Sequence, residues 1–393
     1  MDEKSNFIGV VQTKSLSFAE ACRDFGISRK TGYKWLRRYK AQGIAGLEAR
    51  SRAPKRRAWA MPDEMASQLL ELRRKRPTWG PRKMLAWLQT KNPKTEFPAA
   101  STVGDLLKRK GLVVSIPRRR SFPNDAPPNL KKAFAPNDCW CVDFKGHFFI
   151  NNRRCYPLTV TDNFSRFLLG CDALLTMSVE DARPVFTRIF LEYGLPRTIR
   201  SDNGAPFASN GPGGLCPLAV WWLRLGIRLE RIPPGKPQHN GRHERMHRTL
   251  KAETTRPPES TNRAQQRRFD EWRVDYNTER PHEALKNAVP AKFYRASRRK
   301  LPAELSEIKY PGHYDVRRVA EGGHIKLGGK YLWVSQALPG ERIGLEEVDD
   351  DVWRLYFGRL LLGIVDARLD KLQMMQVPVI DSNSHPVASK LKP

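Results

Sequence analysis

The 393-residue sequence lacks any apolar run that approaches the length of about 18 residues needed to cross a membrane. Its N-terminus, with Asp2 and Glu3, also lacks the basic and then apolar pattern of a signal peptide. The six cysteines show neither CxxC spacing nor Cys/His finger spacing, which argues against a zinc site. We therefore expect a soluble protein of the cytoplasm whose cysteines are buried and reduced.

The sequence also lacks a balance of charge. It has 70 Lys and Arg against 41 Asp and Glu, a net charge of +29. The excess lies in residues 1–310, because residues 311–393 carry 11 basic and 11 acidic side chains. A charge of this size indicates a nucleic acid or an anionic membrane as partner. No basic helix with Trp or Phe anchors stands out, so we expect nucleic acid, with no membrane and no small-molecule substrate.

The length predicts several domains, since one hydrophobic core rarely serves so long a chain. We expect all-α units first, then an α/β domain, then a small all-β barrel. The expected boundaries are a helix-turn-helix domain at 1–58, a second three-helix domain at 59–114, a linker at 115–136, the α/β domain at 137–300, the barrel at 312–370 and a loosely ordered tail at 371–393.

Residues 17–40 have the pattern of a helix-turn-helix. Ser17 and Glu20 have the spacing of a capping box, a glycine ends the first helix, and Ser28 caps a second helix at 29–40. The second helix has a basic face, made of Arg29, Lys30, Lys34, Arg37 and Arg38. This arrangement suits the major groove of DNA, although an ordinary helical hairpin differs from it only in charge.

A second helical unit follows, with helices that begin near residues 61, 81 and 100. Its last helix ends in Lys108 and Arg109, which we expect to contact DNA. Two such units in tandem predict a long binding site on DNA. The proline-rich linker after them contains Arg118-Arg119-Arg120.

From residue 137 the apolar pattern changes to that of a mixed α/β sheet. Strands are expected at 140–144, 147–150, 155–161, 166–175, 197–200 and 227–232. Helices are expected at 179–193, 218–225, after residue 240 and at 262–276. Residues 314–366 then contain five short strand candidates separated by turns, which predicts the small barrel.

Three carboxylates of the α/β domain need an explanation together. Asp143 lies inside an apolar strand, Asp202 follows another strand, and Glu244 lies on the helix after the sheet. If they meet at the ends of the strands, where ligands bind in such sheets, they form a set of hard oxygen donors for two Mg²⁺ or Mn²⁺ ions. Each also has a purely structural alternative. Asp143 can be a buried, hydrogen-bonded Asp, Asp202 can stabilise a turn, and Glu244 can form a surface ion pair.

Glu244 is the one carboxylate in a strongly basic helical segment, residues 236–251. At helical spacing Glu244 shares a face with His247, Arg248 and Lys251. A helix that lies against a polyanion explains these basic residues, and we expect the histidines of the segment to contact DNA. The alternative is an exposed helix with ordinary surface ion pairs.

Four motifs together resemble the DDE signature of the retroviral-integrase-like catalytic core, above all that of bacterial insertion-sequence transposases. The motifs are Val142-Asp143-Phe144, Ser201-Asp202-Asn203-Gly204, Asn240-Gly241-x-x-Glu244-Arg245-x-His247-Arg248-Thr249-Leu250-Lys251 and Tyr276-Asn277-x-x-Arg280-Pro281-His282. The resemblance covers most of the chain. It implies a ribonuclease-H-like core for residues 137–300.

The resemblance implies that Asp143, Asp202 and Glu244 are the catalytic residues and hold two Mg²⁺ (or Mn²⁺) ions. Water would cleave DNA at an element end, and the 3′-OH released would attack a target strand. Lys251 matches the basic residue that contacts the element end, and we also expect contacts from the remaining polar residues of this helix, Asn240, Arg245 and Arg248. The partners would be double-stranded DNA of the terminal repeats and the target, bound by a homo-oligomer associated with the bacterial nucleoid.

The sequence departs from the family in two respects. The 41 residues between Asp202 and Glu244 exceed the usual spacing, and a glycine-rich stretch at 209–214 accounts for the excess as an insertion. The zinc unit of retroviral integrases is absent. Two other functions stay open: a DNA-binding regulator that has lost catalysis, and a structure-specific nuclease.

Overall fold

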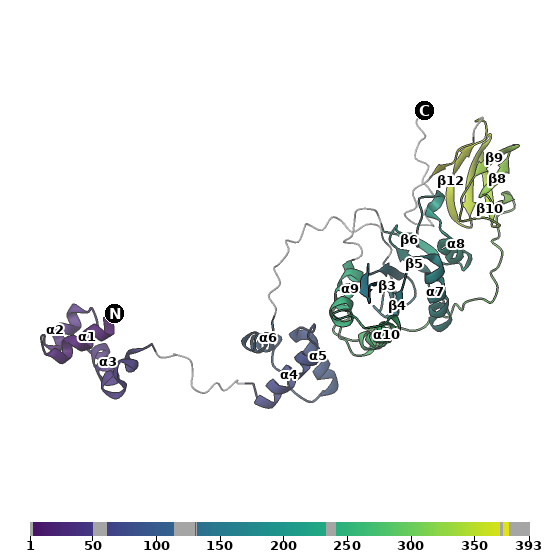
Figure 1. Ribbon diagram of the computed structural model, residues 1–393. Helices are drawn as coiled ribbons and strands as arrows, with labels where there is room; N and C mark the ends of the chain where they lie inside the picture. The colour runs from purple at the N-terminus through teal and green to yellow at the C-terminus, as the bar shows by residue number, and fades with distance from the viewer. Residues whose placement is uncertain are drawn as a thin grey trace. The chain divides into compact units, whose positions relative to one another are not determined.

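The computed structural model describes residues 3–49, 61–113, 130, 132–232, 241–369 and 372–376 (Figure 1). Contacts divide the chain into two compact units, Met1–Pro62 and Asp63–Pro393. No helix within these described ranges is long and apolar enough to span a membrane.

The first unit consists of three α-helices and a short 3-10 helix. Their bounds are α1 Glu3–Thr13, α2 Phe18–Asp24, α3 Arg29–Gln42 and η1 Gly43–Leu47. The structure confirms both predicted helices and the capping box of Ser17 and Glu20. It adds α1, which the sequence analysis missed. α1 contributes Phe7 and Ile8 to the core, and because these core residues are adjacent, the segment lacks a clear helical period.

The predicted second helical unit is also present, with bounds α4 Asp63–Lys75, α5 Pro81–Lys91 and α6 Ala100–Arg109. It packs around Trp79, Met84 and Leu107, which are all buried. Polar contacts join it to the helix at residues 262–278, since Trp87 Nε1 donates to Glu279 at 2.6 Å and Arg76 is ion-paired with Asp275.

The α/β part has six strands, as predicted. They are β1 Trp140–Phe144, β2 Phe148–Ile150, β3 Arg153–Asp162, β4 Leu168–Leu174, β5 Thr198–Ser201 and β6 Arg228–Arg231. The order in the sheet is β2-β3-β1-β5-β6, with β4 also paired to β3. β1 is antiparallel to β3 and parallel to β5, so the sheet is mixed.

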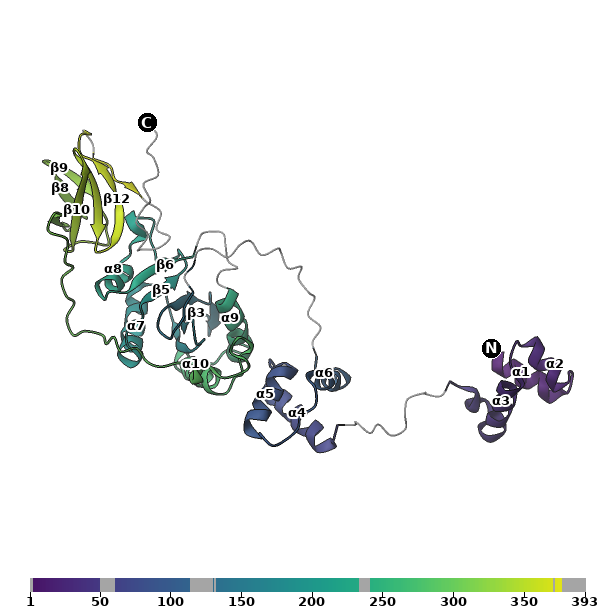
Figure 2. The same ribbon diagram turned by 180° about the vertical axis from the view of Figure 1, so that it is seen from behind.

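Helices cover both faces of this sheet (Figures 1 and 2). The helices are α7 Val179–Tyr193, α8 Pro217–Arg224, α9 Gly241–Thr254 and α10 Asn262–Thr278. α7 and α8 bury Phe186 and Trp222 against one face, whereas α9 and α10 bury Leu250 and Phe269 against the other. The carboxylate on α9 therefore belongs to the second face.

The C-terminal part is all-β, as predicted, but has six strands rather than five between residues 314 and 366. They are β7 Asp315–Arg318, β8 His324–Leu327, β9 Lys330–Trp333, β10 Arg342–Asp349, β11 Val352–Phe357 and β12 Leu360–Asp366, and β13 Met375–Gln376 follows them. The strands form a five-stranded sheet, β13-β12-β11-β10-β7, and the hairpin β8-β9.

The glycine-rich stretch at 209–214 contacts this β domain. The 3-10 helix η2, Pro212–Gly214, packs against β12, and Gly213 has a φ of +65°. A Cβ at Gly213 would lie only 3.1 Å from Leu362 and 3.2 Å from Leu360. The stretch predicted as an insertion thus helps to hold the β domain against the sheet, and the two share one hydrophobic cluster.

Candidate active site

Asp143 lies near the C-terminal end of β1, on the face of the sheet covered by α9. The period of two along a strand explains this position. Trp140 and Val142 are buried in the cluster under α7 and α8, so Cys141 and Asp143 point to the opposite face. Asp143 is half-buried there, with its side chain 16% exposed.

Asp202 follows the last residue of β5, and the pairing of β5 with β1 sets its position. The two strands are parallel, with Trp140 opposite Ile199 and Cys141 opposite Arg200. Continued by two residues, the same register brings Asp202 level with Asp143. Asp202 also has the turn role that was considered for it, because Gly204 N donates to its Oδ1 at 3.2 Å.

Glu244 is exposed in the first turn of α9. Arg245, Arg248 and Lys251 are also exposed, farther along the helix. The opposite side of α9 is buried against the sheet, through His243, Met246, His247, Leu250 and Thr254. Glu244 is therefore free of the core and faces solvent. These exposed basic residues of the helix, Arg245, Arg248 and Lys251, are among the predicted DNA contacts. Asn240, which was also predicted to contact DNA, falls outside the described residues.

The two histidines of α9 do not lie on the face predicted for them. His243 and His247 are 3% and 5% exposed, so the expectation that they contact DNA is wrong. Their spacing of four residues, interleaved with Met246 and Leu250, puts them on the buried stripe of the helix. The basic surface of α9 thus consists of arginine and lysine alone.

Each buried histidine meets a threonine of β3. His243 Nε2 lies 3.4 Å from Thr161 Oγ1, and His247 Nε2 lies 2.8 Å from Thr159 Oγ1. The sequence analysis missed these contacts. A signal was present, because Thr159 and Thr161 alternate with the apolar residues Leu158 and Val160 and so put two hydroxyls on one face of the strand.

The hydrogen bonds of Thr159 determine the tautomer of His247. The single hydroxyl proton of Thr159 goes to the carbonyl oxygen of Asp143 at 3.0 Å. The threonine oxygen must then accept from His247 Nε2, which leaves Nδ1 without a proton. His247 Nδ1 lies 3.8 Å from Asp143 Oδ2, a distance suited to an ion pair only if the ring is charged. Burial, with His243 and Lys145 nearby, lowers the pKa of His247 to about 2, so we describe it as neutral.

The buried histidines predict a loss of stability in acid. Burial lowers the pKa of His243 to about 4, whereas an unfolded histidine takes up its proton near pH 6.5. The unfolded chain therefore binds more protons below pH 6.5, and the free energy of unfolding should fall by about 2 kcal/mol from pH 7 to pH 5 for His243 alone. Urea denaturation at several pH values measures this slope.

A His243→Gln variant should show a smaller pH dependence than the unaltered chain. The matched control is His313→Gln, because His313 is exposed in the β domain and its loss should leave the slope unchanged. Equal slopes for the two variants would contradict the assignment of His243 as a buried neutral ring.

Asp143 and Asp202 are level at the ends of β1 and β5, and Glu244 lies on α9, which packs on the face of the sheet to which Asp143 points. β1 and β5 are parallel, so their C-terminal ends bring Asp143 and Asp202 together, and α9 carries Glu244 across the same face. The described ranges contain no group of three His, Cys, Asp or Glu side chains close enough to hold a metal ion. The predicted triad is thus placed on three neighbouring elements, and its closure around a metal remains a prediction.

The predicted DNA contacts of the two helical units lie mostly on the surface. On α3, Arg29, Lys30, Lys34 and Arg37 are exposed, but Arg38 is half-buried. Lys108 and Arg109 are exposed at the end of α6. Four of the five predicted residues of α3 are therefore exposed to solvent. A DNA contact by Arg38 stays a prediction, and less of its side chain can reach DNA.

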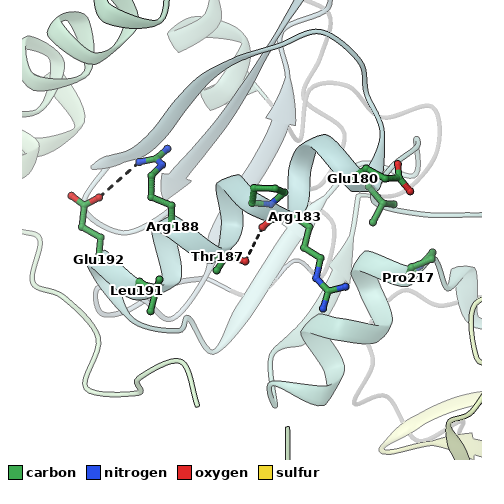
Figure 3. A pocket seen from close by; sticks show the side chains of 9 residues that line it. Glu180, Arg183, Thr187, Arg188, Leu191, Glu192 and Pro217 are labelled. Carbon is green, nitrogen blue, oxygen red and sulfur yellow. Dashed lines mark hydrogen bonds and ion pairs between the residues drawn. The ribbon is translucent and has the colours of Figure 1, made fainter. Parts of the chain in front are cut away.

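A groove of about 1010 Å³ lies elsewhere, on the exposed side of α7 (Figure 3). Leu191 and Pro184 give it an apolar lining, and Arg188 pairs with Glu192 at its rim. Since α7 covers the opposite face of the sheet from α9, the groove is not part of the carboxylate site.

Comparison with known families gives two kinds of domain. The integrase core domain matches residues 133–237 in one form and residues 225–290 in another. The homeodomain-like domain matches residues 10–48 and, in a second form, residues 31–107.

Among curated proteins, the chain is 28% identical over 245 residues to the insertion element IS407 uncharacterized 31.7 kDa protein of Burkholderia multivorans, covering 60% of this chain and 83% of that protein. It is 28% identical over 238 residues to the insertion element IS476 uncharacterized 39.2 kDa protein of Xanthomonas euvesicatoria, covering 58% and 64%. It is 32% identical over 124 residues to the Pol polyprotein of Feline endogenous virus ECE1, covering 31% of this chain and 11% of the polyprotein.

Solved structures with a similar part include the HTLV-2 integrase catalytic core domain in complex with magnesium. The TM-score is 0.34 at 14% identity, over 42% of this chain and 100% of that one. A simian T-cell lymphotropic virus intasome in complex with a PP2A regulatory subunit gives a TM-score of 0.37 at 17% identity, over 70% and 97%.

The sequence matches define the class. Residues 133–290 match the integrase core domain, and residues 10–107, before them, match homeodomain-like domains. Over these parts the chain is similar to proteins of bacterial insertion elements and to retroviral polyproteins.

Proposed function

We propose that this protein binds the ends of an insertion element and, with divalent metal ions, cleaves and joins DNA strands through Asp143, Asp202 and Glu244. One observation carries the proposal. The parallel register of β1 and β5 brings Asp143 level with Asp202, and α9, which carries Glu244 on its exposed side, packs on the face of the sheet to which Asp143 points.

The donor set fits the metal that this proposal requires. All three side chains offer carboxylate oxygens, which are the ligands that Mg²⁺ and Mn²⁺ prefer. Glu244 and Asp202 are exposed, so both can turn toward an ion that Asp143 holds from the strand. Two bound ions would lower the pKa of the attacking water and stabilise the oxygen that leaves phosphorus.

The residues of the chain then have separate tasks. Asp143 would hold both ions, while Asp202 and Glu244 would each complete the ligand set of one. The neutral ring of His247 fills the space behind Asp143 and, being buried, keeps water from the inner side of that carboxylate. Arg248 and Lys251, exposed on the same side of α9 as Glu244, would hold the DNA backbone over the carboxylates.

The reaction would consist of two displacements at phosphorus. In the first, water attacks at the element end, the bond to the 3′-oxygen breaks, and the strand ends in a 3′-OH. In the second, that hydroxyl attacks a target phosphodiester, and a target 3′-oxygen leaves. Because two ends must be joined to one target, we infer that more than one subunit acts in the DNA complex.

The basic face of α3 would hold the element end before the chemistry begins. Replacing Lys34 and Arg37 by Gln should weaken binding and reduce the slope of log K against log salt by about two, since each lost phosphate contact removes about 0.9. Fluorescence anisotropy over a salt series measures the slope. The control is Lys326→Gln, an exposed lysine of the neutral β domain, and an equal effect there would contradict a specific role for α3.

One assay tests the function as a whole. Purified protein is mixed with Mg²⁺, labelled DNA from a candidate element end and a supercoiled target plasmid. We expect labelled end DNA joined to the plasmid. Cleavage without joining would favour a nuclease, and stable binding without any cleavage would favour a regulator derived from a transposase.

A further inference from the structure

Two arginines share one acceptor residue at the turn between β3 and β4. Arg166 Nη1 donates to the main-chain oxygen of Asn163 at 2.6 Å. Arg242 Nη1, from the first turn of α9, donates to Asn163 Oδ1 at 2.5 Å. Each guanidinium also lies 3.4 Å from the other oxygen of Asn163. A neutral amide therefore holds two positive groups side by side.

The turn that carries this pair is firmly held. Asn163 is 6% exposed, and its amide N donates to Cys139 O at 2.9 Å. The buried carboxylate of Asp162 accepts from Ser165 N at 2.7 Å and from Asn137 N at 2.8 Å. Arg166 itself has a φ of +65°, a conformation that is uncommon for residues other than Gly, Asn and Asp and that often marks a functional position.

Within the described residues, no ion pair balances the positive charge of the two arginines. In the described part of the chain, neither Arg166 nor Arg242 forms an ion pair with a carboxylate, and residues 233–240, just before α9, contain no Asp or Glu. Burial, followed by the charge of Arg242, lowers the pKa of Arg166 to about 10, so Arg166 stays charged at neutral pH. Arg245 adds a third positive charge near the pair. A cluster of positive charges of this kind favours the binding of an anion.

We propose that the Arg166–Arg242 pair, held by Asn163, is a binding site for one phosphate of the DNA backbone. Two planar guanidinium groups with a common acceptor behind them match the several oxygens of a phosphodiester better than a single lysine does. The inference rests on the proposed function, since it assigns a second contact to the DNA that the carboxylates would cut.

The strand register gives the position of this phosphate relative to the carboxylates. Asp143 pairs with Thr159 and Trp140 with Asp162, so Asn163 lies four residues along β3 from the level of Asp143. Four residues of strand span about 13 Å. The pair should therefore contact a phosphate other than the one that is cut.

The decisive variant is Asn163→Asp, which places a carboxylate between the two arginines with almost no change of shape. A purely structural role for the pair predicts normal DNA binding, with thermal stability equal or improved. A phosphate site predicts equal or improved stability together with about tenfold weaker binding to end DNA, because the new carboxylate neutralises the positive charge that would attract the phosphate. Arg166→Gln should also reduce the salt slope by about one.

The position is tested with end DNA that carries a single uncharged methylphosphonate at each backbone position in turn. The unaltered protein should bind least well to DNA modified at one backbone position near, but not at, the cleavage site, and Asn163→Asp should have lost that sensitivity. The control is Arg183→Gln, on α7 at the opposite face of the sheet (Figure 3). Arg183 lies over the ring of Trp221 there. This variant should bind and respond to the methylphosphonate as the unaltered protein does.

Three results would count against these assignments, each in a different way. If the unaltered protein neither binds nor cleaves end DNA, the proposed function fails, and this inference fails with it. If it does both, but Asn163→Asp keeps normal affinity and the same methylphosphonate pattern, the phosphate site alone is wrong. An equal loss of affinity in Arg183→Gln would also overturn the site, because it would show a general effect of charge.

Discussion

Replacing Asp143 by Asn is expected to abolish both cleavage and joining while binding to the element end survives. The amide keeps the shape of the side chain but loses the negative charge that would hold metal ions on β1. The rate should fall by at least about 10³-fold, which corresponds to about 4 kcal/mol of transition-state stabilisation. Cleavage and joining are measured on gels with Mg²⁺, and end binding is measured by anisotropy.

The control for this variant is Asp138→Asn, a carboxylate that lies just before β1 and accepts hydrogen bonds from Phe134 N and Ala135 N. It should keep near-normal cleavage, because Asp138 lies at the other end of the strand from Asp143. Joining that persists in Asp143→Asn at the normal rate would overturn the assignment of the carboxylate site.

The second large effect concerns a buried ion pair beneath the site. Arg200 Nε lies 2.7 Å from Glu230 Oε2, and the two side chains are 9% and 5% exposed. Arg200 on β5 lies opposite Glu230 on β6. Arg200 is two residues before Asp202 in the sequence. Replacing Glu230 by Ala removes the buried counter-charge of Arg200 and should lower the free energy of unfolding by about 3–5 kcal/mol. Urea denaturation followed by tryptophan fluorescence measures the loss.

An exposed ion pair provides the matched control. Arg342 and Glu307 have side chains that are 56% and 73% exposed, so Glu307→Ala should cost less than about 1 kcal/mol. Changing both partners of the buried pair, as Arg200→Met with Glu230→Leu, should recover much of the loss because no buried charge remains. A Glu230→Ala protein as stable as the Glu307→Ala protein would contradict the burial of this pair.

Elements with a strong apolar period were predictable within a residue or two. α7 has the predicted bounds, because Ser178 caps it and its buried residues, such as Phe186 and Ile189, recur at helical spacing. α1 was not predicted, since its buried residues Phe7 and Ile8 are adjacent and become a core only when α2 and α3 close over them. The short strands of the β domain were undercounted for a similar reason: pairing partners define them more than their own pattern does.

The candidate site shows the same division. Its carboxylates stood out in the sequence because Asp143 interrupts an apolar strand, Asp202 begins an Asp-Asn-Gly turn, and Glu244 is alone among basic residues. The directions in which the α9 side chains point could not be predicted from the sequence. A helix with charged residues on almost every side can be turned several ways, and only the packing of Met246 and Leu250 against the sheet determined that His247 is buried.

By itself, the sequence determined the kinds of elements, the excess of positive charge and the three acidic residues, because propensity, composition and local spacing are properties of short segments. Tertiary structure decided that Asp143 and Asp202 are level, that His247 lies behind Asp143, and that Arg166 and Arg242 meet at Asn163. Those relations depend on strand register and helix rotation, which arise from contacts between segments as much as 104 residues apart and leave no local pattern in the chain.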